Sequence, residues 1–176
     1  CRTVSAERVV STIPLDHLSS LLAGHPSGRQ PRLQARGLRF LNLGFDSPLP
    51  LDTTWIYDPR ASSSFTRLQI PAARSPLMVP SGCGSLQLEE PFETSALPID
   101  LRLETVLNAV REIGFDVGNP VLAFETMEPR AYPVFFRDTG SRVRELEAFV
   151  TSFPRLQISG RQGRFSYIFL DLAYAQ

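Results

Sequence analysis

Apolar residues in this chain alternate with polar or small ones in many short runs, the pattern of half-buried β-strands. The run from Phe40 to Phe45, for example, places Asn42 and Gly44 between apolar neighbours. Similar runs predict strands at residues 9–14, 40–45, 53–57, 65–70, 85–89, 121–125, 131–135 and 156–159. Trp55 and Tyr57 fall on one face of their strand, and their size favours a place in the core.

A helical period appears in fewer places, and turn residues delimit each of them. Pro14 is expected to open a helix that ends near Gly24, and Gly114 to end the clearest one, whose apolar stripe starts at Leu103. Ser141 is expected to cap a third helix, which Pro154 stops. Residues 32–38 are read as a short helix and residues 71–82 as irregular.

Together these elements predict an α+β fold rather than a regular alternation of strands and helices. Consecutive strands between residues 40 and 90 are joined by short loops, which favours a mixed, largely antiparallel sheet. The helices are then expected to pack on one face of that sheet. At 176 residues, the length fits one domain or part of a larger one.

Composition excludes several kinds of chemistry. The formal net charge is +0, so no electrostatic footprint for nucleic acid is present. All 18 basic residues are arginine, which excludes a catalytic lysine or a phosphate-binding loop built on lysine. Arginine is well suited to bidentate contacts with phosphate.

Cysteine and histidine are too sparse for a disulfide framework or a zinc site. Cys1 and Cys83 are far apart, and His17 and His25 lie near the N-terminus, so we expect no metal. No apolar run of membrane length or signal peptide appears, so a cytoplasmic location without membrane contact is expected. The start at Cys1 suggests a piece of a longer protein.

The segment that follows the last predicted strand has the composition of an anion site. Gly160 and Gly163 alternate with Arg161 and Arg164, and a helix is expected to begin soon afterwards. Glycine lets backbone N–H groups approach a ligand closely, and guanidinium groups supply positive charge. The alternative is that these arginines form ordinary surface ion pairs.

This last block resembles the C-terminal flavin-contacting motif of UDP-galactopyranose mutases and their amine-oxidase-like relatives. Earlier blocks resemble the same family in the same order, and together they cover most of the chain. They are the crossing strand at 9–14, the segment from Phe65 to Leu68 with Arg67, the acid Glu89, and the block from Ala131 to Val134 with Tyr132.

The resemblance implies that the chain is the substrate-domain fragment of an FAD-dependent enzyme acting on a small molecule, in particular a sugar nucleotide. Residues 1–157 would form the substrate-binding domain, and residues 158–176 the flavin-facing loop and helix start. Arg67 and Arg161 would be catalytic. The substrate would contact Arg67, Glu89, Tyr132 and Tyr167, and the flavin would contact Gly160, Arg161, Gly163, Tyr167 and Asp171.

Departures from the family pattern leave other functions open. No Gly-x-Gly-x-x-Gly motif follows a strand, so the dinucleotide-binding part is absent and this piece alone is not expected to hold FAD. Phe169 stands at a position that is polar in the mutases, which puts galactopyranose specificity in doubt. An amine-oxidase-like or desaturase-like flavin oxidoreductase remains an alternative, as does a binding or structural module without chemistry.

Overall fold

The computed structural model describes residues 3–24, 33–50, 52–60, 65–93 and 103–175. The chain divides into two compact units, one made of residues 1–35 and 132–176 and the other of residues 36–131. Each unit has its own hydrophobic core. The fold is α+β, as the sequence predicts, with a two-stranded parallel sheet in the first unit and a five-stranded sheet in the second.

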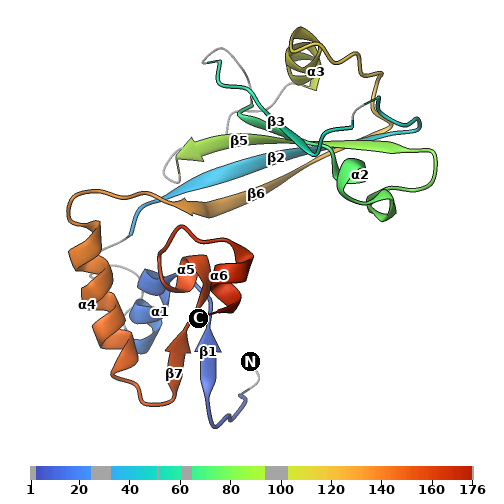
Figure 1. The fold of residues 1–176 in the computed structure, drawn as a ribbon. Coiled ribbons are helices and arrows are strands. Elements are labelled where there is room, and N and C mark those ends of the chain that lie inside the picture. The colour runs from blue at the N-terminus through green and yellow to red at the C-terminus, as the bar shows by residue number, and fades with distance from the viewer. Residues whose placement is uncertain (1–2, 25–32, 51, 61–64, 94–102, 176) are drawn as a thin grey trace. The chain divides into compact units, whose positions relative to one another are not determined.

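The first unit joins the two ends of the chain (Figure 1). Strands β1 and β7 pair in parallel, so that Val9 lies opposite Leu156. Helix α1 packs against α4, and Leu15, Leu146 and Val150 are buried between them. The elements of this unit are β1 (Val9–Ser11), α1 (Leu15–Leu22), α4 (Thr139–Thr151), β7 (Leu156–Ile158), α5 (Gly160–Gly163) and α6 (Leu170–Tyr174).

The second unit is built around a sheet with the strand order β3-β4-β5-β2-β6. The pairs β3–β4, β4–β5 and β5–β2 are antiparallel. Its elements are β2 (Ala35–Phe45), β3 (Trp55–Tyr57), β4 (Arg67–Gln69), α2 (Pro71–Arg74), the 3-10 helix η1 (Pro76–Met78), β5 (Gly84–Glu93), α3 (Leu103–Glu112) and β6 (Leu122–Pro133).

Helix α3 covers one face of this sheet because its apolar stripe meets an apolar stripe on the strands. Val106 and Val110 are fully buried against Leu68 and Leu88, which lie opposite each other on β4 and β5. Gly114 follows the helix at φ +96°, a conformation that glycine adopts without strain. The sequence predicts this helix and its end correctly.

Several local predictions are wrong. Residues 33 and 34 precede a strand that begins at Ala35, so the helix expected at 32–38 is not formed in its described part. Most of the two runs expected at 121–125 and 131–135 belongs to one continuous strand, β6, which extends from Leu122 to Pro133. Residues 71–78 contain α2 and η1 rather than irregular chain, and α4 begins at Thr139, before Ser141.

The large aromatic residues of β3 are also not where the sequence predicts. Trp55 is 45% exposed and Tyr57 is 62% exposed, because β3 is the edge strand and these side chains point away from the core.

No described helix is long and apolar enough to cross a membrane. Within the described ranges, no group of three His, Cys, Asp or Glu side chains could hold a metal ion.

Candidate functional site

The first unit gathers three of the predicted site residues into one cluster. The guanidinium of Arg161 lies over the ring of Tyr167 at 4.8 Å and over the ring of Tyr132 at 5.4 Å. The two rings stack on each other with 5.6 Å between their centroids. Residues far apart in sequence therefore bring two stacked rings against one cation, which is a favourable arrangement.

Hydrogen bonds fix the orientation of this guanidinium. Nε and Nη2 of Arg161 both donate to the carbonyl oxygen of Ile168, at 3.0 and 2.9 Å. Such a fork is available to arginine but not to lysine. Nη1 takes part in none of the hydrogen bonds found among the described residues, so one edge of the group is available to an anionic ligand.

The chain around Arg161 is held by its neighbours. Phe165 has φ +47°, which is uncommon for a residue other than glycine, and its ring is buried against that of Phe135. Tyr167 remains 55% exposed. Backbone outliers of this kind cluster at functional sites, and this loop presents an exposed tyrosine and an arginine that is held by two hydrogen bonds.

The two glycines of this segment have different surroundings. Gly160 has φ +83°, and a side chain there would meet nothing within 4 Å. Gly163 is buried, and a Cβ atom on it would lie 3.0 Å from the carbonyl oxygen of Ser11. Gly160 therefore borders open space, whereas Gly163 lets α5 pack closely against the end of β1.

Arg164 does not join this cluster. Its Nε lies 3.4 Å from Oε1 of Glu147 on α4, and the arginine is 44% exposed. The two arginines of the turn therefore have different partners, Ile168 for Arg161 and Glu147 for Arg164. Asp171 lies in the first turn of α6, and its side chain is exposed.

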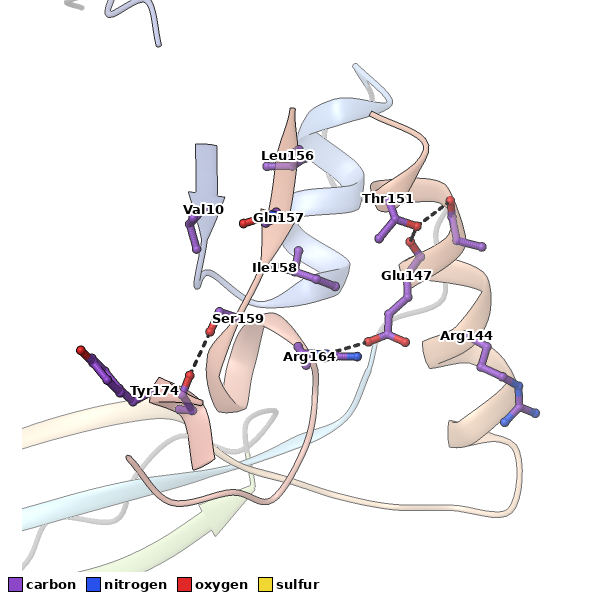
Figure 2. A pocket seen from close by; sticks show the side chains of 12 residues that line it. Val10, Arg144, Glu147, Thr151, Leu156, Gln157, Ile158, Ser159, Arg164 and Tyr174 are labelled. Carbon is purple, nitrogen blue, oxygen red and sulfur yellow. Dashed lines mark hydrogen bonds and ion pairs between the residues drawn. The ribbon is translucent and has the colours of Figure 1, made fainter. Parts of the chain in front are cut away.

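Arg164 and Glu147 instead border a cavity of about 760 Å³ in the first unit (Figure 2). Ser159 donates to the carbonyl oxygen of Ala173 at its edge, at 3.2 Å. The side chain of Arg144 extends away from the others (Figure 2). The charged groups that do face the cavity pair with each other, so they offer little free charge to a ligand.

The second unit contains Arg67 and Glu89, which lie opposite each other on β4 and β5. Nη2 of Arg67 donates to Oε1 of Glu89 in a tight ion pair, and Nη1 lies 3.4 Å from the hydroxyl of Tyr57. Glu89 is only 3% exposed, so removal of Arg67 would leave a buried carboxyl group without its ion-pair partner. The pairing places both side chains on one face of the sheet.

A row of amide side chains continues from this ion pair across the sheet, and sequence analysis does not identify it. Gln69 contacts Glu89 and also donates to Gln87 at 3.2 Å. Gln87 donates to Asn42 on β2 at 2.8 Å. We call Arg67, Glu89, Gln69, Gln87 and Asn42 the polar row. The alternation Arg-Leu-Gln in β4 and Gln-Leu-Glu in β5 is the signal that could have found it.

Glu90 points to the opposite face, as neighbouring strand residues must. It lies 3.6 Å from the buried guanidinium of Arg39, and Glu125 lies at the same distance on another side. Burial raises the pKa of Glu90, Arg39 lowers it, and Glu125 raises it further. These three residues form a charge cluster separate from the polar row.

The predicted site residues are thus brought together in two groups, one in each unit. Tyr132, Arg161 and Tyr167 form the cluster of the first unit, and Arg67 and Glu89 belong to the second.

Comparisons with known proteins identify the fold. No protein-family model matches the chain, and no curated protein matches it either. A crystal structure of reduced UDP-galactopyranose mutase has a TM-score of 0.70 and 18% sequence identity, over 91% of this chain and 36% of that chain. The expected resemblance is therefore confirmed for the fold.

A second solved structure has the same fold over nearly the same region. It is a protein from Exiguobacterium sp. 255-15 that is provisionally named protoporphyrinogen oxidase, with a TM-score of 0.59 and 17% identity. It covers 89% of this chain. This chain spans 36% of the length of both matched proteins, so it corresponds to about a third of each.

Proposed function

We propose that this chain is the substrate-binding and flavin-facing part of an FAD-dependent enzyme that acts on a sugar nucleotide. The observation that carries the proposal is the contact of the Arg161 guanidinium with the stacked rings of Tyr132 and Tyr167. It offers a fixed positive charge and an exposed aromatic ring in a fold that the chain has in common with UDP-galactopyranose mutase. The mutase-like activity belongs to the intact protein, of which this chain supplies a part.

The flavin side of the proposed site consists of Gly160, Arg161, Gly163, Tyr167 and Asp171. The open space beside Gly160 and the exposed ring of Tyr167 fit a large planar group nearby. Gly163 would act indirectly, by seating α5 against β1. When bound, FAD would supply the redox-active ring system, while Arg161 would stabilise negative charge and exclude water from its edge.

The small parallel sheet of the first unit supports a dinucleotide-binding partner segment. Parallel sheets occur almost only where both faces are covered and further strands are present. Here β1 pairs with β7 alone among the described strands, and Val9 and Val10 are 50% and 60% exposed. A separate βαβ unit of the intact protein would complete this sheet. The division into a substrate-binding part (1–157) and a flavin-facing part (158–176) is a proposal about roles. The two compact units of the structure have other boundaries, since residues 36–131 form one unit and the rest of the chain the other.

The substrate side consists of Arg67, Glu89, Tyr132 and Tyr167. Arg67 is rigid because Glu89 and Tyr57 both hold it. Arg67 would bind the diphosphate and stabilise the charge that develops as a nucleotide leaves the sugar. These interactions are hydrogen bonds to charged groups, each contributing roughly 1.5–3 kcal/mol.

Binding of UDP-galactose to the intact protein tests this proposal. Arg161→Ala is expected to weaken binding roughly tenfold to a hundredfold, and Arg161→Lys to restore it only in part. Arg164→Ala is the matched control, because Arg164 pairs with Glu147 outside the cluster. Equal affinities for the wild type and Arg161→Ala would reject a ligand role for Arg161.

A flavin oxidoreductase is the second candidate, and an apolar groove on the second unit favours it. The groove is bordered by Met78, Leu122 and Phe124, which suits a substrate with an apolar body. The two candidates differ in electron balance. Substrate-dependent reduction of the bound flavin would favour the oxidoreductase, whereas interconversion of two sugar isomers without net redox change would favour the mutase.

A further inference from the structure

The charge cluster of Arg39, Glu90 and Glu125 joins three neighbouring strands of the second unit. Arg39 lies on β2, and Glu90 lies opposite it on β5. Glu125 lies on β6, which borders β2 on its other side (Figure 1). Strand alternation places Arg39 on the same face as Leu41, a member of the core that α3 covers. The cluster therefore lies on the opposite face from the polar row.

The guanidinium of Arg39 is shared between the two carboxylates. Its Nη1 lies 3.6 Å from Oε2 of Glu90 and 3.6 Å from Oε1 of Glu125, which is too long for a hydrogen bond. Nε and Nη1 of Arg39 and Oε2 of Glu90 are buried, and none has a hydrogen-bond partner among the described residues. The side chain of Arg39 is 3% exposed, those of Glu90 and Glu125 30% and 37%. One buried cation thus faces two half-exposed acids.

The cluster has one negative charge in excess when both carboxyl groups are ionised. Burial raises the pKa of Glu90, Arg39 lowers it, and Glu125 raises it again, with a net increase. The two acids therefore act on each other across β2, because a like charge nearby disfavours ionisation.

The other charged groups of the neighbouring elements are directed elsewhere. On α3, Glu112 pairs with Arg60, Arg111 donates to Asn108, and Glu104 is exposed. On the strands, alternation places the remaining charged residues on the opposite face; they are Arg36, Glu89, Glu93, Glu128 and Arg130. The charge balance of the cluster is thus set by its three members.

Strand β6 is the element that this balance affects most. It is an edge strand with β2 as its single neighbour in the sheet, and its residues 122–129 are exposed. Edge segments with little burial open locally at a lower free-energy cost than the core. Opening of β6 would carry Glu125 away from Arg39 and leave Arg39 to Glu90 alone, which favours the ionised form of Glu90.

We propose that the charge cluster is a proton-operated latch, in which a proton held by Glu90 keeps the edge strand β6 closed on β2 and its release loosens β6. A neutral Glu90 leaves Arg39 to pair with Glu125 without repulsion from a second acid. The latch depends on neither a flavin nor a substrate. Because Tyr132 lies near the end of β6, the latch would act on a strand that carries a residue of the site in the first unit.

Hydrogen exchange of the intact protein, measured by mass spectrometry at several pH values, tests the latch. The closed strand binds the proton more tightly than the opened one, so its stabilisation is present at low pH and is lost as the pH rises through the pKa of Glu90. After correction for intrinsic exchange, protection of residues 122–128 should fall roughly threefold to tenfold between about pH 4.5 and about pH 7.5. Protection in α3, the internal reference, should stay constant.

Substitutions that remove one charge each separate the latch from a general charge effect. Glu90→Gln should keep the high protection of β6 at every pH, because the amide stands in for the neutral acid. Glu128→Gln is the matched control: it removes the same charge from β6 on the opposite face, where Glu128 accepts a hydrogen bond from the amide of Arg130. This control should retain the pH dependence of the wild type.

Three outcomes would overturn the latch. They are protection of β6 that does not change with pH in the wild type, an unchanged pH dependence in Glu90→Gln, and loss of that dependence in Glu128→Gln. If Glu90→Gln does not fold, NMR titration of the Glu90 carboxyl carbon in the wild type decides. A midpoint above pH 4.5, the ordinary value, is expected, and a midpoint at or below it would reject the latch.

Discussion

The guanidinium of Arg161 has both a structural and a proposed functional role. It donates twice to Ile168 and lies against two tyrosine rings, so it connects β6, α5 and the segment that leads to α6. Loss of such contacts affects stability as well as binding, and the two effects must be measured separately. Arg164 provides the comparison, because it belongs to the same turn and makes a single exposed ion pair.

Arg161→Ala is expected to lower the free energy of unfolding by about 1.5–3 kcal/mol, because two hydrogen bonds to a charged donor are lost. Hydrogen exchange should become faster at Ala173 and Ala175, whose amides close the last helix. Arg164→Ala should change stability by less than about 1 kcal/mol. Similar losses for both variants, measured by denaturant unfolding, would contradict the contacts described for Arg161.

The half-buried position of Glu90 predicts a dependence of stability on pH. Its pKa is raised in the folded protein, mainly because burial disfavours the charged form. The folded state therefore holds this proton at pH values where the unfolded state has lost it. The contribution of this proton to the free energy of unfolding is fully present below pH 4.5, the pKa of Glu90 in the unfolded chain. It is lost as the pH rises through the higher pKa of the folded protein.

Comparison with Glu90→Gln isolates this effect. Relative to the variant, the wild type should gain stability as pH falls from 7 toward 4.5, the ordinary value for glutamate. Chemical unfolding at several pH values provides the measurement. A difference between the two proteins that stays constant over this range would show that Glu90 does not titrate as described.

At the scale of elements, the sequence predicts those whose pattern and end signals agree. Helix α3 has a continuous apolar stripe and a terminal glycine, and α1 follows Pro14, so both are found as expected. Strands β4 and β5 are likewise found where alternating runs predict strands. Local pattern is sufficient in these cases because burial and local preference favour the same structure.

The wrong predictions come from contacts between distant segments. The residues at the start of β2 are compatible with a helix, but this segment forms a strand because it pairs with β5. Gly37 lies opposite Phe92, whose ring covers it. Trp55 is exposed because β3 is an edge strand, a property of strand order and not of its own sequence. The row through Asn42 requires the register of several strands, which no short motif contains.

The contact of α5 with β1 can be tested through a glycine. In Gly163→Ala, the new methyl group would lie 3.0 Å from the carbonyl oxygen of Ser11 and 3.4 Å from Cα of Thr12, so α5 must shift. We expect a loss of about 1–3 kcal/mol, typical of overpacking. Gly118→Ala is the control, because nothing lies within 4 Å of the added atom. Equal melting temperatures for both variants would mean that α5 is not seated as described.

At the scale of the whole molecule, the chain has two hydrophobic cores. Val150 belongs to the core of the first unit and Val110 to that of the second, and both helical valines are 0% exposed. Each core is formed by residues of one unit. Local stability can therefore differ between the units.

Matched substitutions in the two cores test this independence. Val150→Ala and Val110→Ala should each cost about 2 kcal/mol, as buried methyl groups are lost. Hydrogen exchange should accelerate mainly within the unit that carries the substitution. If either variant accelerates hydrogen exchange equally in residues 36–131 and in the rest of the chain, the two cores are not independent.

The visible absorbance of the purified intact protein tests most directly whether this chain forms part of a flavoenzyme. We expect flavin bands from bound FAD in the intact protein, and none from residues 1–176 alone, because this chain has no dinucleotide fingerprint. An intact protein that is colourless and cannot be reconstituted with FAD would contradict the claim.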